Sequence, residues 1–302
     1  MKQFTLLFFT FIFIACQTNN TKDKIKKVPN DWFFKQRAFP YPSIDAELHL
    51  AFQKSKNEFT SNQRSPNAFN QAWIPIGPSD EGGRLTDIEM WPNDKNTILI
   101  GSASGGIFLS ENQGNSFEPI FDDAMSLSIG DIALAPSNEQ RIYVGTGEAN
   151  AGGGSLAYDG IGVYRSDDKG NSWSHIGLEK VGSIGKIVVD PDNEDVLYVA
   201  AMGTLFGNNE DRGIYKSEDG GISWEKVLYI NNATGGIDLA IDPSNPNNVY
   251  AALWQRERSV SELNYGGPHS GIYKSEDGGD TWSELNNGLP TIDKGRLAFA
   301  IA

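Results

Sequence analysis

The chain has 302 residues, with 25 Lys and Arg against 39 Asp and Glu, and a formal net charge of −14. Nucleic-acid binding depends on neutralising phosphates with Lys and Arg, so this balance argues against a nucleic-acid partner. Cys16 is the only cysteine, which excludes an intramolecular disulfide.

Residues 1–15 predict an export signal. Lys2 precedes an apolar run from Phe4 to Ile14, which is too short to span a membrane. Phe13-Ile14-Ala15-Cys16 resembles the bacterial lipoprotein box, although Phe13 stands where Leu is usual. The resemblance implies that Cys16 is lipidated and anchors an exported protein in the cell envelope, at the outer membrane or cell surface, without spanning it. The alternative is a plain signal peptide with an incidental cysteine.

Residues 16–30 are polar and rich in lysine, which predicts a flexible tether. Residues 31–71 form an N-terminal extension with one predicted helix, which Ser43 can cap. We expect the apolar side of this helix to pack on the domain that follows, residues 72–302. Its apolar residues recur at helical spacing and are Ile44, Leu48, Ala51, Phe52 and Phe59.

An eight-residue pattern occurs four times in residues 72–302, as SENQGNSF, SDDKGNSW, SEDGGISW and SEDGGDTW. The copies begin at Ser110, Ser166, Ser217 and Ser275, at spacings of 56, 51 and 58 residues. A short motif at such a period indicates a repeat architecture. The pattern Ser-x-Asp-x-Gly-x-Ser/Thr-Trp resembles the Asp box of the BNR-repeat β-propellers, from about Trp73 to the end. That family includes sortilin-like propellers and bacterial envelope proteins described as glycosyl hydrolases.

The resemblance implies an all-β propeller made of four-stranded antiparallel blades. Each repeat contains four apolar segments, here called strands A to D. Strand A ends at a proline turn, and the centre of strand B follows each proline after seven residues. The prolines are Pro92, Pro136, Pro191 and Pro243, and the strand centres are Leu99, Tyr143, Tyr198 and Tyr250.

The Asp box is predicted to be the hairpin between strands C and D. Its Ser and Asp can bond within the turn, its Gly permits positive φ, and its Trp can pack against neighbouring strands. We therefore expect a structural role without catalysis. Calcium binding in these loops stays open, although their spacing is not that of a calcium-loop motif. The residues in this role are Ser166, Asp168, Gly170, Trp173, Ser217, Asp219, Gly221, Trp224, Ser275, Asp277, Gly279 and Trp282.

Two further segments match single strands of the repeat. Trp73–Gly77 matches strand D but has no Asp box before it, and Gly295–Ile301 matches strand A. We expect about four blades and parts of a fifth, with the N-terminal strand completing the last blade. The chain is then either an open arc or a fragment of a longer propeller.

The connection between strands B and C varies from 9 to 23 residues, whereas the distance from strand D to the next proline stays at 18 or 19. Insertions on one face of a repeat protein often mark its binding face. We therefore expect the B–C loops to bind a peptide, protein or glycan. The candidate ligand residues are Glu148, Asn150, Tyr158, Asp159, Asn208, Asn209, Arg212, Trp254, Arg256, Arg258 and Tyr265.

Two functions remain open at this stage. The first is a binding propeller at the cell surface, similar to the sortilin-type propellers that hold peptides. The second is a glycoside hydrolase, which needs two carboxylates across a substrate groove. Four carboxylates are expected on the same face as the B–C loops and are therefore the candidate catalytic residues: Asp80, Glu81, Asp123 and Glu148.

Two departures weaken the hydrolase hypothesis. The sialidase signature Phe-Arg-Ile-Pro is absent, the nearest arginine context being Gly83-Arg84-Leu85. Xyloglucanase-like propellers commonly carry an Asp after the first strand B, whereas Gly101–Gly105 has no carboxylate. The pattern predicts no metal site and no cofactor, and it leaves the oligomeric state open.

Overall fold

The computed structural model describes residues 51, 54–55, 83–150, 157–258 and 263–301. The predictions for the export signal, Cys16, the tether and Trp73–Gly77 lie outside these residues, as do Asp80 and Glu81. Ala51, Lys54 and Ser55 are helical, as expected, but Ala51 is exposed. Within the described ranges, no helix is long and apolar enough to cross a membrane.

The described chain is all-β and forms four antiparallel sheets, each here called a blade. The first blade contains β1 (Leu85–Trp91), β2 (Asp94–Ser102), β3 (Gly106–Ser110) and β4 (Glu118–Pro119). The second contains β5 (Ile129–Leu134), β6 (Ile142–Thr146), β7 (Val163–Ser166) and β8 (Ser174–His175). The third contains β9 (Ser183–Val189), β10 (Leu197–Gly203), β11 (Gly213–Ser217) and β12 (Glu225–Leu228). The fourth contains β13 (Thr234–Ile241), β14 (Val249–Arg258), β15 (Leu263–Tyr265), β16 (Gly271–Ser275) and β17 (Ser283–Leu285).

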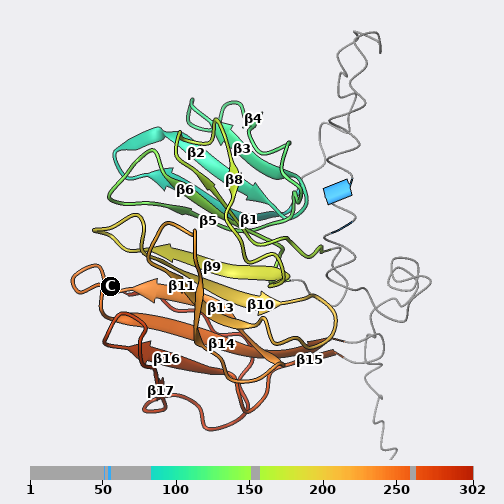
Figure 1. Cartoon of the computed structure of the whole chain (residues 1–302), viewed down its shortest axis with the longest axis vertical. Helices are drawn as coiled ribbons and strands as arrows, with labels where there is room; N and C mark the ends of the chain where they lie inside the picture. The colour runs from blue at the N-terminus through green and yellow to red at the C-terminus, as the bar shows by residue number, and fades with distance from the viewer. Residues whose placement is uncertain (1–50, 52–53, 56–82, 151–156, 259–262, 302) are drawn as a thin grey trace, which may run out of the picture.

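The blades follow one another along the longest axis of the molecule (Figure 1). In each blade the strands pair in chain order, with β15 added to the end of β14. The strand A positions of successive blades, β1, β5, β9 and β13, pack against one another. These four strands therefore form the inner side of a radial array, as the repeat predicts.

The hydrophobic core lies between the blades. Leu99 and Ile107 of the first blade pack with Ile142 of the second, and similar clusters fill the next two interfaces. Each of these three side chains is fully buried, which contributes about 1.5–3 kcal/mol apiece. The alternation of apolar residues along each strand thus supplies both faces of an inner blade.

The four Asp boxes have the predicted hairpin geometry. In the third box, Ser217 Oγ donates to Asp219 Oδ1 at 2.8 Å and accepts the Gly221 amide at 2.8 Å. Gly221 has a φ of 90°, which favours glycine. The Asp219 carboxylate also accepts the Ser223 amide at 2.9 Å, and the hydrogen bonds from Ser223 lower the pKa of Asp219 to about 2.

The box tryptophans join neighbouring blades. Trp173 Nε1 donates to the Ile120 carbonyl at 2.8 Å, and Trp224 Nε1 donates to the Ile176 carbonyl at 2.8 Å. Each acceptor belongs to the end of the preceding blade. Trp282 differs, because its Nε1 donates to Gly279 of its own box at 2.9 Å.

The segment Gly295–Ile301 was expected to be strand A of a fifth blade. It is not a β-strand in the structure, so the prediction of a hydrogen-bonded strand here was wrong. Nevertheless, Phe299 packs against the inner face of the fourth blade, and its amide donates to Asp238 Oδ2 at 3.1 Å. The segment therefore lies beside the fourth blade, where a fifth inner strand would begin.

Candidate functional site

The B–C loops and the linkers from strand D to the next strand A meet at one end of the blades. Gly160 of one B–C loop donates its amide to the Gly182 carbonyl at 2.6 Å, and Asn209 of another donates to the Asn232 carbonyl at 3.1 Å. This end, here called the loop face, lies at the right of Figure 1, toward β15.

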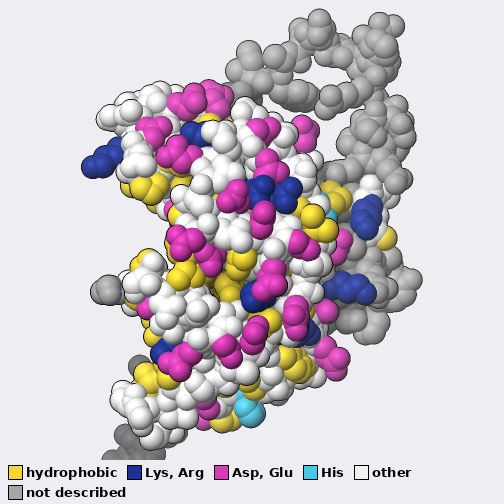
Figure 2. Space-filling view, turned by 60° about the vertical axis from the view of Figure 1, so that its left-hand side comes forward, with side chains coloured by type: hydrophobic (Ala, Val, Ile, Leu, Met, Phe, Trp, Pro, Cys, Tyr) yellow, Lys and Arg dark blue, Asp and Glu magenta, His cyan; other side chains and the backbone are white. Residues whose placement is uncertain are grey.

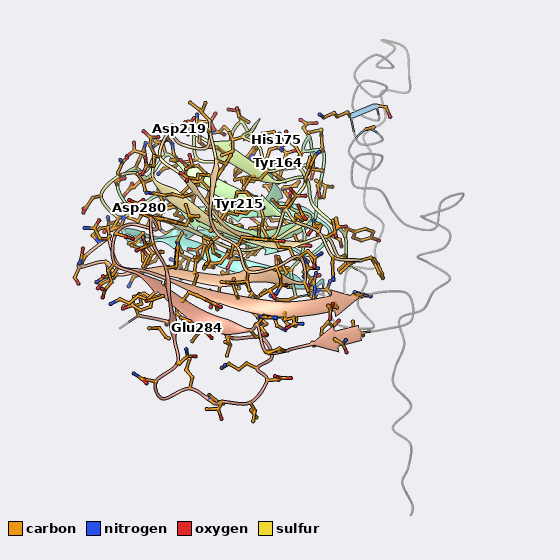
Figure 3. All side chains as sticks on the ribbon, turned by 60° about the horizontal axis from the view of Figure 1, so that its bottom comes forward. Tyr164, His175, Tyr215, Asp219, Asp280 and Glu284 are labelled. Atoms are coloured by element: carbon orange, nitrogen blue, oxygen red, sulfur yellow. The ribbon has the colours of Figure 1, made fainter. Side chains whose placement is uncertain are left out.

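The Asp boxes and the A–B turns occupy the opposite end. The Gly220 amide donates to the Asp195 carbonyl at 2.9 Å, and the Gly278 amide donates to the Asn247 carbonyl at 2.9 Å. Asp219 and Asp280 of the third and fourth boxes lie on this side of the molecule (Figure 3). Asp and Glu side chains are spread over it, interspersed with Lys and Arg (Figure 2). The Asp boxes are thus remote from the candidate ligand residues.

The last B–C loop contains more regular structure than the sequence analysis expected. Trp254, Arg256 and Arg258 belong to β14, which continues to Arg258 and forms a hairpin with β15. Placing them in a loop was therefore wrong. The alternation of Trp254, Arg256 and Arg258 at every second position was the signal that could have revealed the strand.

Arg212 and Arg256 are buried, each with 1% of its surface exposed. Arg256 Nη1 donates to the Ala149 carbonyl at 2.7 Å, and Arg212 Nη1 donates to the Ala233 and Arg256 carbonyls at 2.7 and 2.8 Å. These bonds connect the loops of the second, third and fourth blades. The two guanidinium groups therefore hold the loop face together instead of projecting into solvent.

Burial lowers the pKa of Arg212 to about 9, and the nearby charge of Arg256 contributes to this shift. Burial likewise lowers the pKa of Arg256 to about 10. Both groups stay charged at neutral pH, so the loop face holds two buried positive charges.

Arg258 and Trp254 are also largely buried, each with 6% exposure. The Arg258 guanidinium lies over the Phe206 ring at 4.6 Å, and the Arg256 guanidinium lies 5.7 Å from the Trp254 ring. Trp254 in turn packs against Tyr265, with ring centroids 5.5 Å apart. Aromatic and cationic groups thus alternate along this part of the face.

The exposed candidates are fewer. Tyr158 and Tyr265 have 40% and 37% of their surface accessible, and Asn150 and Asn208 are exposed. Asn208 Nδ2 donates to Glu257 Oε1 at 3.2 Å. These side chains supply aromatic and amide groups at the surface of the loop face.

Two other candidates brace the loops. Asp159 accepts the Leu205 amide at 2.7 Å and so connects the loops of the second and third blades. Asn209 Nδ2 lies 3.5 Å from the Lys180 carbonyl, while its Oδ1 is buried without a hydrogen-bond partner.

The candidate catalytic carboxylates do not form a pair among the described residues. Glu148 is buried and forms an ion pair with Arg84. Burial raises the pKa of Glu148, and the charge of Arg84 opposes the shift. Asp123 is exposed on the linker to β5. The turn between β2 and β3 contains no carboxylate, and its Ala103 is buried.

A second polar group lies on the inner strands and was missed. Asp131 of β5 accepts Lys186 Nζ at 2.9 Å, and Glu89 and Lys186 line a groove of about 490 Å³. Burial raises the pKa of Glu89 to about 7, with a further increase from Asp87. Charged residues in otherwise apolar inner strands were the available signal. Among the described residues, no three His, Cys, Asp or Glu side chains are grouped to hold a metal ion.

Residues 162–294 match the family model Sortilin-Vps10, described as sortilin, neurotensin receptor 3. The chain is 25% identical over 243 residues to a xyloglucanase of Hypocrea jecorina, which covers 71% of this chain and 27% of the relative. It is 27% identical over 235 residues to an oligoxyloglucan-reducing end-specific xyloglucanase of Emericella nidulans. This match covers 72% of this chain and 26% of the relative. The chain therefore spans about a quarter of the length of these curated relatives.

Solved structures agree on the fold. An ancestral GH74 enzyme superposes with a TM-score of 0.52 at 22% identity, over 68% of this chain and 26% of that chain. The GH74 xyloglucanase of Xanthomonas campestris superposes with a TM-score of 0.50 at 20% identity, over 69% of this chain and 31% of that chain. Four Asp-box hairpins, four radial blades and these matches together show that the chain has the fold of a β-propeller with Asp-box repeats.

Proposed function

We propose that this chain is the glycan-binding part of a glycoside hydrolase of the xyloglucanase type, and that it binds a glycan across its loop face. The observation that carries the proposal is the similarity of about 70% of the chain to xyloglucanases. Because the chain covers only about a quarter of those relatives, its activity and substrate are inferred by analogy.

The chemistry of the loop face supports glycan binding. Tyr158 and Tyr265 present exposed rings on which sugars can pack, and Asn150 and Asn208 present amides that can bond to hydroxyl groups. The buried hydrogen bonds of Arg212 and Arg256 hold the loops beneath these groups. Such preorganisation lowers the entropic cost of binding.

Hydrolysis requires a general acid and a second carboxylate across the scissile bond. Glu148 is the candidate acid, because a carboxyl group whose pKa is raised by burial retains its proton nearer to neutral pH. The second carboxylate would be Asp123, Asp80 or Glu81. The guanidinium of Arg84 forms an ion pair with the Glu148 carboxylate, so a substrate would have to displace that guanidinium to reach Glu148.

The test uses the full chain without residues 1–15, incubated with xyloglucan oligosaccharides, other β-glucans and sialosides. We expect binding of a β-glucan, with release of reducing ends if the chain carries both carboxylates. Glu148→Gln should abolish turnover but preserve binding, whereas Glu225→Gln, an exposed change on β12, should preserve both. The absence of binding to every glycan would contradict the proposal.

The match of residues 162–294 to the Sortilin-Vps10 model favours a second candidate function, the binding of an extended peptide. A peptide array probed with the same protein distinguishes the two. Binding of peptides that no glycan displaces would favour this second candidate.

We also propose that Cys16 anchors the protein to a membrane through a lipid, on the basis of Phe13-Ile14-Ala15-Cys16. Cys16→Ala should move the protein from the membrane fraction to the soluble fraction of lysed cells. A variant that stays tightly membrane-bound would contradict lipid anchoring at this residue.

A further inference from the structure

The loop face contains several buried hydrogen-bond donors without an acceptor. Trp254, Arg256 and Arg258 lie at every second position of β14, so their side chains share one face of the strand. Trp254 Nε1, Arg256 Nε and both Nε and Nη1 of Arg258 are buried and have no hydrogen-bond partner among the residues that the structure describes. Buried donors in folded proteins are nearly always bonded, so this group marks a place where an acceptor is expected.

The same place carries excess positive charge. The hydrogen bonds of Arg256 end on the backbone carbonyls of Ala149 and Thr204. Among the described carboxylates, the charge that acts on both Arg256 and Arg258 is that of Asp159, which also accepts the Leu205 amide. Buried charges are costly unless an opposite charge compensates them. The missing acceptor is therefore expected to be an anion.

An exposed aromatic ring lies beside these donors. Tyr265 stands directly opposite Arg256 in the β14–β15 hairpin, and its ring packs against Trp254 at 5.5 Å. Residues opposite each other in an antiparallel pair have Cβ atoms about 4.5–5.5 Å apart. Since 37% of Tyr265 is accessible, a ligand ring can lie on it while an acidic substituent turns toward the arginines.

We propose that Trp254, Arg256, Arg258 and Tyr265, here called the β14 arginine site, receive the carboxylate of a uronic acid residue in an acidic glycan. The sugar ring packs on Tyr265, and the carboxylate accepts hydrogen bonds from the Arg258 guanidinium, with Arg256 behind it. This inference rests on the proposed function, because it assigns the sugar class that the loop face selects.

Arg258 is the entry point of the site because it is the last residue of β14. Its guanidinium lies over Phe206 at 4.6 Å, and its free N–H groups are covered. Binding therefore requires this side chain to turn from Phe206 toward the ligand. A guanidinium suits the task, because its planar donors match both oxygens of a carboxylate.

The experiment compares three probes on the full chain without residues 1–15: short oligogalacturonides, the same oligosaccharides with carboxyl groups reduced to alcohols, and neutral xyloglucan oligosaccharides. Calorimetry should show about tenfold tighter binding of the carboxylate form than of its reduced form. Equal affinities for the two forms would overturn this inference but leave glycan binding intact. Failure of all three probes to bind would overturn this inference, and failure of the other β-glucans and sialosides as well would overturn the proposed function.

Two substitutions locate the effect. Arg258→Gln should remove the preference for the carboxylate form, and Arg258→Lys should retain part of it, because lysine keeps the charge but loses the paired donors. Lys95→Gln removes the same charge from an exposed position at the opposite end of the first blade and should retain the full preference. Folding of each variant is checked by circular dichroism, and an Arg258→Gln protein that keeps the preference would overturn the assignment.

Discussion

The Asp131 carboxylate joins the second blade to the third by accepting the Ile187 amide at 2.7 Å. The same link joins the first blade to the second, where Asp87 accepts the Ile132 amide at 2.8 Å. In the fourth blade, Asp238 accepts the amide of Phe299, in the segment that follows the blade, at 3.1 Å. Successive inner strands are thus connected by a side chain to a backbone amide, in addition to apolar packing.

Asp131→Ala should lower the free energy of unfolding by about 2–4 kcal/mol, because it leaves the Ile187 amide and Lys186 without their acceptor. Asp131→Asn should cost less, since an amide oxygen can still accept the backbone bond. Denaturant unfolding measures both, with the exposed Asp192→Ala as a control that should be nearly neutral. Equal stability of Asp131→Ala and the wild type would contradict a structural role for this link.

Glu89 should make the stability depend on pH. Burial, aided by Asp87, raises the pKa of Glu89 to about 7 in the folded state, above its value of 4.5 in the unfolded chain. The folded state therefore binds more protons between these values, and its stability falls as pH rises through about 7. The Glu89→Gln variant stays neutral at this position. Between pH 4.5 and 7 its free energy of unfolding should therefore fall by less than that of the wild type, the difference being on the order of 1 kcal/mol. Unfolding curves at several pH values would test this, and parallel pH profiles would contradict it.

The Asp-box tryptophans should affect stability and not ligand binding. Trp224→Phe removes the 2.8 Å bond to the Ile176 carbonyl of the neighbouring blade and should cost about 1–3 kcal/mol, because that acceptor is left unpaired. Trp282→Phe breaks a bond within its own box and serves as the comparison. Affinity for glycans should be unchanged in both folded variants. A lower affinity would assign these residues a role that the structure does not suggest.

Gly130 allows the second and third blades to approach closely. A Cβ at this position would lie 2.1 Å from the Ile184 carbonyl oxygen, which is backbone and cannot rotate away. Gly130→Ala should therefore destabilise the fold by about 2–4 kcal/mol. Gly83→Ala is the matched control, since a Cβ there meets nothing within 4 Å. Thermal denaturation measures both, and similar melting temperatures would show that the blades can separate without cost.

The hairpins and the strand order could be predicted because their signals are local. Ser217, Asp219 and Gly221 form a turn whose bonds lie within four residues, and strand B keeps a fixed distance from the turn proline. The position of the loop face could also be predicted, because alternating strand direction puts the B–C loops at the end opposite the A–B turns and Asp boxes. The extension of β14 to Arg258 was missed, because variable length was interpreted as irregular structure.

The sequence by itself determined the repeat, its four-stranded unit and the end of the blades where loop length varies, since each depends on side-chain alternation and turn chemistry within one repeat. Only the tertiary structure decided which candidate residues are accessible. Arg256 bonds to Ala149, 107 residues away, so its burial depends on a neighbouring blade that local sequence does not specify. For the same reason the inner-strand links of Asp131 and Asp238 and the unpaired donors of Arg258 became visible only when the blades were placed side by side.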